Sequence, residues 1–341
     1  MLLSLLRDRP AVLVLGHTWP HHAHRSGYQP IADGVGGQLP RSLRLVPRPF
    51  ERVLRRVSHD EAIAERVAVW ASVYAARPRV LHVLLGDADH RLVAPRPPLS
   101  KVRLVATFHH PPDELETTIA RVGLGSLDAA ICVARCQLPL VSSIVPANRV
   151  YFLPHGVDTD YFRPSGAAHD PDLVLSVGSH RRDYETLARA ATLIRTERPA
   201  TVVRLIATPS DVSRIDPVLL QDVELMPNVS DDELRRQYRL AAALLLPLEE
   251  TTANNSLLEA MACGVPVVTT DLLGVRDYIE EPDAILCPPG DAERLADSVL
   301  RILADRDLAE RMSRGSRTRA EQVAWPKIRQ QLLALYDELS S

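Results

Sequence analysis

The first half of the chain alternates continuous apolar runs with segments in which apolar residues recur at helical spacing. The runs lie at 11–16, 80–87, 102–110, 127–134 and 149–158, and the helical patterns lie at 60–78 and 111–123. Continuous apolar runs are typical of strands buried on both faces, and their alternation with helices indicates parallel β-α-β units. This half is therefore predicted to form one doubly wound, Rossmann-like α/β domain.

The second half repeats the same pattern. Strands are expected at 172–178, 201–208, 223–226, 242–247 and 265–270, and helices at 183–199, 230–241, 255–264 and 291–305. Between the halves, residues 156–172 are rich in turn-forming residues and poor in apolar runs, which is typical of a domain boundary. We therefore predict an α/β protein with two Rossmann-like domains in tandem.

In doubly wound sheets, ligands bind beyond the carboxyl ends of the strands. That rule selects the loops after strands 11–16, 102–110 and 172–178 and the loop around 247–256. The last of these leads into a predicted helix that starts near Ser256 and ends before Gly264 and Pro266. A helix start at a strand end suits a phosphate group. The spacing of Ser256 and Glu259 equally fits a capping box, in which Glu259 bonds the Ser256 amide.

Composition narrows the class of protein. The 341 residues are 46% hydrophobic and 24% charged, with a formal net charge of −3, so we expect packed domains and no binding to nucleic acid. Basic residues are in excess in the first 160 positions, which suits either an anionic acceptor or membrane surface or a chance imbalance. Lys101 and Lys327 are the two lysines, so a phosphate site must rely mainly on arginine, backbone amides or helix ends.

The four cysteines form no C-x-x-C pair, and we expect free thiols in a reduced, cytoplasmic setting. No apolar run approaches the ~20 residues that span a bilayer, and the first ten residues are too short an apolar stretch for a secretion signal. Peripheral contact with a membrane remains open, as does the oligomeric state.

Two motifs together resemble a known family. The stretch PHGVDTDYFRP at 154–164 is followed by NNSLLEAMACGVPVVTTDLLGVRDYI at 254–279. This order resembles the retaining glycosyltransferases of the GT-B fold, specifically glycosyltransferase family 4. The resemblance implies two Rossmann-like domains facing across a cleft, with an acceptor-side domain at 1–155 and a nucleotide-sugar domain at 156–315. Residues 316–341, around Trp325, would form a helix that packs back on the first domain.

The resemblance also assigns the loop before the 255–264 helix. Glu259 is similar to the second of two family glutamates and would bind the ribose hydroxyls of a nucleotide. The first glutamate, which contacts the donor sugar, aligns with Thr251, so Glu250 is expected to take its place. The diphosphate would face three backbone amides, those of Asn255, Ser256 and Leu257.

The remaining donor contacts follow strands 172–178 and 223–226. After Gly178, the family places an arginine and a lysine on the diphosphate, whereas this chain has Arg181 and Arg182, of which Arg182 is the better match. Neutralising the charge on the departing diphosphate is the main catalytic task. The base of the nucleotide is expected near Val229. His109, at the end of strand 102–110, would position the donor sugar or stabilise charge.

The loop HTWPHHAHRSGYQ at 17–29 contains four histidines, and its composition argues against zinc because it holds Pro20 and no cysteine or carboxylate. The family has a glycine here that approaches the phosphates, and Gly27 is similar to it. We expect His17, His24 and Tyr28 to lie on the acceptor side.

The predicted function is transfer of a sugar from a nucleotide-diphosphate donor, UDP or GDP, to a hydroxyl of a natural product, glycolipid or polysaccharide. The reaction would retain configuration and need no metal or cofactor. Three alternatives stay open: a nucleotide-sugar 2-epimerase of the same fold, a homologue that binds the donor without catalysis, and a thiol or amine acceptor.

Overall fold

The computed structural model describes most of the chain and divides it into two compact units. The described residues are 10–16, 35–40, 61–94, 96–97, 100–119, 124–166, 169–208, 211, 215, 218, 220–227 and 229–341. The first unit contains the described residues up to Leu153 together with Ile328–Ser341, and the second contains Pro154–Lys327. In the described part, no helix combines the length and apolarity needed to cross a membrane.

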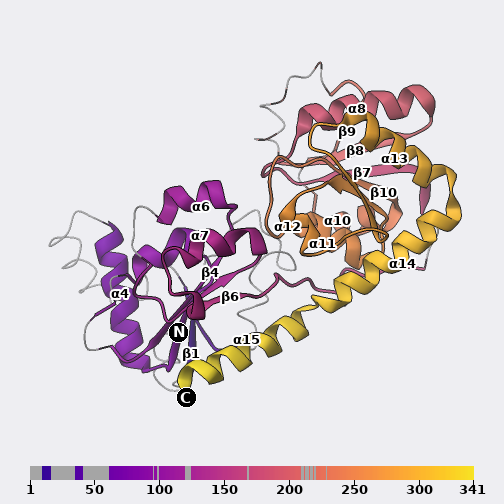
Figure 1. The fold of residues 1–341 in the computed structure, drawn as a ribbon. Helices are drawn as coiled ribbons and strands as arrows, with labels where there is room; N and C mark the ends of the chain where they lie inside the picture. Colours follow the sequence, from indigo (N-terminus) through magenta and orange to yellow (C-terminus); the bar gives the residue numbers. More distant parts are fainter. Residues whose placement is uncertain are drawn as a thin grey trace. The chain divides into compact units, whose positions relative to one another are not determined.

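The first unit is built on a six-stranded parallel sheet in the order β2-β1-β3-β4-β5-β6 (Figure 1). Its strands are β1 (Val12–Gly16), β2 (Gly37–Pro40), β3 (Val80–Val83), β4 (Arg103–Phe108), β5 (Ala129–Cys132) and β6 (Val150–Phe152). The order reverses between β1 and β3, because β1 connects to β2 on one side and the later strands lie on the other.

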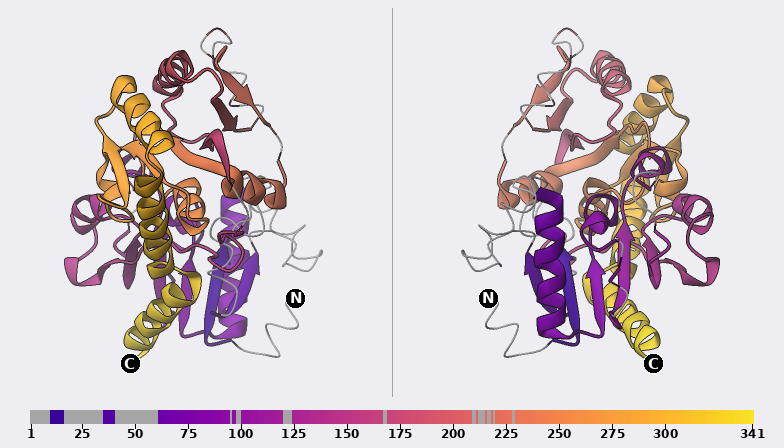
Figure 2. Two further views of the ribbon diagram at one scale, coloured as in Figure 1. Left: turned by 90° about the vertical axis from the view of Figure 1, so that its right-hand side faces the viewer. Right: turned by 90° about the vertical axis from the view of Figure 1, so that its left-hand side faces the viewer.

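Helices cover this sheet and bury its apolar residues. They are α4 (Glu61–Ala76), α5 (Gly86–Asp89), α6 (Pro112–Ile119), α7 (Leu138–Ser142) and α15 (Trp325–Ser340), with short 3₁₀ turns η2 (His90–Leu92), η3 (Arg135–Gln137) and η4 (Ala147–Arg149). Val69 and Val73 of α4 pack in one core with Leu81 and Leu104 of the strands. Figure 2 shows α4 lying along these strands.

The last helix is tied to the first sheet by a buried polar contact. His82 on β3 is hydrogen-bonded through Nδ1 to the Tyr336 hydroxyl (2.5 Å) and through Nε2 to Thr107 Oγ1 (2.7 Å). All three side chains are buried. Burial lowers the pKa of His82 to about 3, so its ring is neutral at pH 7.

The second unit is built on a second six-stranded parallel sheet, in the order β12-β11-β10-β7-β8-β9. Its strands are β7 (Asp170–Val177), β8 (Val202–Ile206), β9 (Val223–Leu225), β10 (Ala241–Leu246), β11 (Val267–Thr270) and β12 (Ala284–Cys287). In this sheet the chain runs from β7 to β9 on one side and from β10 to β12 on the other. The order therefore reverses between β7 and β10, which are hydrogen-bonded neighbours.

The helices of the second unit begin mostly at capping side chains. They are α8 (Tyr184–Glu197), α10 (Asp231–Leu240), α11 (Asn255–Ala262), α12 (Leu273–Arg276), α13 (Ala292–Ala304) and α14 (Arg306–Gln322). Asp183 caps α8 by accepting from the Thr186 amide (2.9 Å), and Ser230 caps α10 by accepting from the Glu233 amide (3.3 Å). In Figure 1, α8 and α13 lie side by side, and both contribute to one core.

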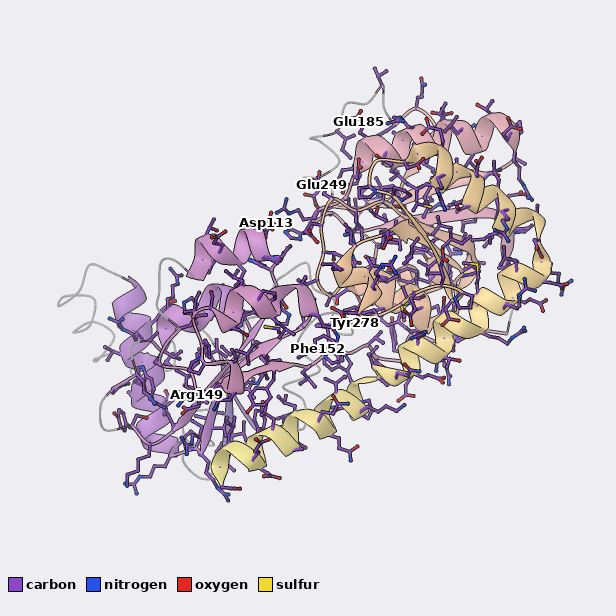
Figure 3. All side chains as sticks on the ribbon, in the orientation of Figure 1. Asp113, Arg149, Phe152, Glu185, Glu249 and Tyr278 are labelled. Carbon is purple, nitrogen blue, oxygen red and sulfur yellow. The ribbon has the colours of Figure 1, made fainter. Side chains whose placement is uncertain are left out.

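The PHGVD segment is positioned by an aromatic contact within the second unit. A Cβ added at Gly156 would lie 2.4 Å from Trp325, so a larger residue would not fit beside the indole ring. The His155 ring packs edge-on against the same indole, with 4.9 Å between ring centroids. The His155 amide donates to the hydroxyl of Tyr278, which is labelled in Figure 3 (2.9 Å).

The prediction of two parallel α/β sheets is confirmed. The observed strands differ from the predicted ones in two short segments. The strand expected over 80–87 ends at Val83, since Gly86–Asp89 turns into α5. β2 was not predicted, because its sequence GQLP contains glycine and proline and lacks the apolar pattern of a strand.

Candidate functional site

In the second unit, the loops after β7 and β10 meet at the point where the strand order reverses. The Glu249 amide donates to the Arg181 carbonyl (3.0 Å), and the Asp183 amide donates to the Pro247 carbonyl (3.2 Å). Ligands of doubly wound sheets bind outside the carboxyl ends of the strands at such a reversal. The structure therefore brings two of the loops selected from sequence to one place.

Arg182 joins these loops to the start of α11. Its Nε donates to the Val177 carbonyl (2.9 Å) and its Nη1 to the His180 carbonyl (2.8 Å). Its Nη2 donates to Asn254 Oδ1 (3.3 Å) and Ser256 Oγ (3.1 Å). Loss of hydration lowers the pKa of this guanidinium to about 10, so it stays positively charged at pH 7.

Gly178 makes this arrangement sterically possible. Its φ is +96°, a conformation that side chains other than hydrogen rarely adopt. A Cβ at this position would lie 2.4 Å from Arg182 Nη2 and 3.0 Å from Ser256 Oγ. Gly178, which was expected beside a phosphate, is therefore the residue that lets the guanidinium reach α11.

The N-cap of α11 is Asn254, which was not among the residues predicted from sequence. Asn254 Oδ1 accepts from the Leu257 amide (3.2 Å), and the Asn254 carbonyl accepts from the Leu258 amide (3.0 Å). The capping box proposed between Ser256 and Glu259 is therefore wrong, since the helix begins at Asn255. The preference of asparagine for N-cap positions is the signal that identifies this residue.

The amide of Leu257 was predicted to face a diphosphate, but in the structure it donates to the capping side chain of Asn254. Because it donates to Asn254, it is not directed at a diphosphate. The amides of Asn255 and Ser256 precede it in the first turn, where N–H groups have no acceptor within the helix. These two amides remain the candidates for binding an anion at the positive end of the helix dipole.

Glu259 is buried in the second turn of α11. Its Oε2 accepts from the hydroxyl of Tyr238 on α10 (3.0 Å). Burial, followed by the nearby Glu259 charge, raises the pKa of the Tyr238 phenol well above its ordinary value, so the phenol stays protonated and donates. Tyr238 lies 21 positions before Glu259, and no local pattern in the sequence indicates the pair.

Glu250 and Thr251, the two residues considered for the role of the family's first glutamate, differ in burial. Glu250 is half-buried, and its Oε1 accepts from the Thr251 amide (2.9 Å). Thr251 is buried, and a Cβ at Gly274 would lie 2.0 Å from its carbonyl oxygen. The backbone at Thr251 is thus packed closely against the start of α12, while Glu250 lies nearer solvent.

Arg181 and Val229 complete the expected donor residues. Arg181 has a left-handed backbone, with φ of +54°, and its Nη1 lies 3.9 Å from the carboxylate of Glu249, labelled in Figure 3. Val229 is half-buried and directly precedes Ser230, the N-cap of α10.

In the first unit, His109 lies in a turn after β4 that two buried side chains hold. Asp87 accepts from the His109 amide (2.9 Å) and the His110 amide (3.1 Å). Gln137 Nε2 donates to the carbonyls of Phe108 (3.1 Å) and His110 (2.9 Å). The His109 ring donates through Nε2 to the Leu84 carbonyl (2.7 Å), so backbone and ring are both oriented.

Asp87 lies in α5, which also contains a second carboxylate, Asp89. The Asp87 carboxylate supports the His109 turn, and burial raises its pKa, although the nearby His110 opposes that effect. Among the described residues, no three His, Cys, Asp or Glu side chains gather as metal ligands. His17, His24, Gly27 and Tyr28 lie outside the described residues.

Solved structures with this arrangement have the GT-B fold. A glycosyltransferase from Rickettsia africae has a TM-score of 0.70 at 12% identity, covering 96% of this chain and 98% of the other. Sucrose-phosphate synthase from Thermosynechococcus elongatus has a TM-score of 0.70 at 21% identity, covering 82% and 78%. The chain therefore has the GT-B fold, as the sequence predicted.

A family model matches part of the second unit. Residues 171–305 match the model described as Glycosyl transferases group 1. A D-inositol 3-phosphate glycosyltransferase of Thermobispora bispora is 27% identical over 219 residues, which cover 57% of this chain and 51% of the relative.

A second relative is a GDP-mannose-dependent alpha-(1-6)-phosphatidylinositol monomannoside mannosyltransferase of Mycobacterium tuberculosis. It is 26% identical over 226 residues, which cover 59% of each chain. The chain thus aligns with about half the length of the curated relatives that it matches.

Proposed function

We propose that this chain transfers a sugar from a nucleotide-diphosphate donor to an acceptor hydroxyl, with retention of configuration. The donor nucleotide binds at the carboxyl ends of β7 and β10 in the second unit. UDP and GDP are the expected nucleotides. One solved structure of this fold, HepE of Anabaena, contains UDP and glucose, and the mycobacterial relative is named for GDP-mannose.

The observation that carries the proposal is the link between Arg182 and the start of α11. It puts a guanidinium charge beside the helix end where the Asn255 and Ser256 amides lack helical acceptors. Glycosyl transfer leaves negative charge on the departing diphosphate, and fixed positive charge and amide dipoles stabilise it. This arrangement supplies such stabilisation from protein groups, and the reaction is proposed to be metal-independent.

Further roles are proposed for the neighbouring residues. Glu259 binds the ribose hydroxyls, Glu250 contacts the donor sugar, and Val229 lies near the base. Arg181 supports the diphosphate. His109 positions the donor sugar, and the loop that contains His17, His24, Gly27 and Tyr28 contacts the acceptor. The acceptor is a natural product, glycolipid or polysaccharide, and the two relatives described above act on inositol phosphate and on a phosphatidylinositol mannoside by their names.

Thermal-shift measurements with UDP, GDP, ADP and dTDP test the donor site. We expect one diphosphate to raise the unfolding temperature of the protein, and the same diphosphate to have a smaller effect on Arg182→Gln. No shift with any of the four nucleotides would contradict the donor-site assignment. Product analysis with the matching sugar nucleotide then separates transfer from epimerisation, because a 2-epimerase yields an altered sugar nucleotide without an acceptor.

A further inference from the structure

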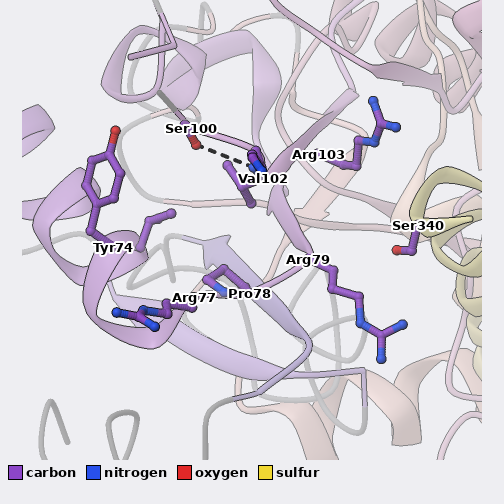
Figure 4. A pocket seen from close by; sticks show the side chains of 10 residues that line it. Tyr74, Arg77, Pro78, Arg79, Ser100, Val102, Arg103 and Ser340 are labelled. Atoms are coloured by element: carbon purple, nitrogen blue, oxygen red, sulfur yellow. Dashed lines mark hydrogen bonds between the residues drawn. The ribbon is translucent and has the colours of Figure 1, made fainter. Parts of the chain in front are cut away.

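A basic pocket lies in the first unit at the amino ends of β3 and β4. Its volume is about 1030 Å³. Figure 4 shows the side chains that line it. It is lined by residues of three segments and one residue of α15: Val73, Tyr74, Arg77, Pro78, Arg79, Ser100, Lys101, Val102, Arg103 and Ser340. The proposed function gives these residues no role.

Four of the lining side chains are cationic, and little negative charge opposes them. Arg103 lies 3.2 Å from Asp128, but the same carboxylate also binds Arg96 at 2.6 Å. The side chains of Arg77, Arg79 and Lys101 form no ion pair within the described part of the chain. Like charges that line one pocket repel each other, and a bound anion relieves that repulsion.

The backbone at Arg77 is a second, independent observation. Arg77 has a φ of +54°, and its amide donates to the Val73 carbonyl (2.8 Å) at the end of α4. Helices commonly end on a left-handed residue, but glycine is the preferred residue there because a side chain is strained. An arginine in this conformation places a cation at the pocket rim at a conformational cost, a feature associated with functional sites.

The pocket combines buried apolar residues with exposed cationic ones, as ligand sites commonly do. Its floor includes the buried residues Val73, Pro78 and Val102, and its rim is formed by exposed arginine and lysine side chains. Arginine forks match the geometry of phosphate oxygens and bind them in pairs. We infer that this pocket binds a ligand with two or more phosphate groups.

The pocket is separate from the His109 turn. Arg103 begins β4 and Phe108 ends it, so a strand of six residues, about 20 Å long, lies between the two. The inference therefore goes beyond the proposed function and does not depend on the donor site in the second unit. The same phosphate chemistry could come from a free metabolite or from a lipid headgroup at a membrane.

Calorimetric titration of the full chain with tripolyphosphate in low salt tests the pocket. We expect binding that weakens with added salt and falls at least tenfold in Arg79→Ser/Lys101→Ser, because half of the pocket's cations are removed. The matched control, Arg301→Ser/Arg311→Ser, removes two exposed arginines from α13 and α14. Arg182→Gln alters the proposed donor site only, so this variant should still bind tripolyphosphate at the basic pocket. Equal affinity in the wild type and the pocket variant, or no binding to the wild type, would overturn the inference.

Sedimentation with vesicles distinguishes the two sources of phosphate. The vesicles contain either phosphatidylcholine alone or phosphatidylcholine with phosphatidylinositol phosphate. Pocket-dependent binding to tripolyphosphate but not to vesicles supports a free ligand, and pocket-dependent binding to both supports a headgroup. Binding to vesicles without tripolyphosphate binding would contradict a discrete phosphate site. Circular dichroism of the pocket variant should match the wild type, because both substituted side chains are exposed.

Discussion

Arg182 has less freedom to bind a ligand than its sequence position indicates. An arginine has five N–H donors, and four hydrogen bonds of Arg182 go to Val177, His180, Asn254 and Ser256. A paired fork on a phosphate would require some of these bonds to break. Its contribution to a bound diphosphate is therefore mainly the field of a fixed positive charge, together with the placement of the Ser256 turn.

Gly178→Ala tests whether that placement depends on space at residue 178. Gly290→Ala is the matched control, because Gly290 also has a positive φ (+74°) but no atom within 4 Å of the added Cβ. We expect the control to lose about 1–2 kcal/mol of unfolding free energy from backbone strain alone. Gly178→Ala should lose more and should also weaken nucleotide binding. Equal losses in both variants, measured by chemical denaturation, would show that the contact with Arg182 is unimportant.

Glu259→Gln separates a ligand-binding role from a structural one. Glutamine keeps an oxygen that can accept from Tyr238 but removes the charge, so the fold should persist while nucleotide affinity falls about tenfold or more. The control is Tyr238→Phe, which removes the hydroxyl that donates to Glu259 and leaves the carboxylate. Calorimetric titration with the nucleotide found by thermal shift gives the affinities. Unchanged affinity with a lowered unfolding temperature would assign Glu259 to the core instead.

The sequence proposes candidate site residues but does not give their contacts. The order of the motifs selects Arg182 and Glu259 as candidates. Their partners Asn254 and Tyr238 could not be predicted, because each contact joins different segments. Arg182 reaches Asn254 from the loop after β7, and Tyr238 of α10 reaches Glu259 of α11. The N-cap of α11 was misplaced by two residues, since Ser256 and Asn254 are both acceptable N-cap residues and only packing decides between them.

Among the elements, the turn after β4 is the most tightly constrained part of the candidate site. Asp87 accepts two of its amides and Gln137 donates to two of its carbonyls, so three consecutive residues are fixed by two buried side chains. Such supporting contacts hold functional groups in one geometry. Asp87 is thus a positioning residue for His109 and not itself a proposed contact of the substrate.

Asp87→Asn is expected to loosen this turn. The amide nitrogen that replaces one carboxylate oxygen cannot accept, so one backbone N–H loses its partner at a cost of about 1–3 kcal/mol. Hydrogen exchange of the amides of residues 109 and 110 should become faster, and the transfer rate should fall. Glu116→Gln, on the exposed face of α6, is the matched control. Unchanged exchange in Asp87→Asn would remove the positioning role.

For the whole molecule, the alternating pattern was sufficient to predict two parallel sheets, because buried strands and amphipathic helices are local properties. The order of strands and the reversal between β7 and β10 required the structure. The contact of His82 with Tyr336 joins residues 254 positions apart, and no local pattern indicates it.

His82 should make the stability of the first unit depend on pH. Its pKa is about 3 in the folded protein and near 6.5 in the unfolded chain, so below pH 6.5 the unfolded chain binds one more proton. Stability from this residue is complete above pH 6.5 and falls by up to about 1.4 kcal/mol per pH unit on acidification towards pH 3. Chemical denaturation between pH 7 and 5 measures the slope, and His82→Gln should reduce it. Parallel slopes for both proteins would exclude His82 as the source.

The return of α15 to the first sheet has a consequence for how the protein matures during translation. A ribosome adds about 5–20 residues per second, so residues 154–327 take on the order of ten to thirty seconds to appear. Throughout that interval His82 has no Tyr336 to contact, while the core of the second unit, whose described residues all lie within 154–327, can already form. The part of the protein that is synthesised first is therefore completed last.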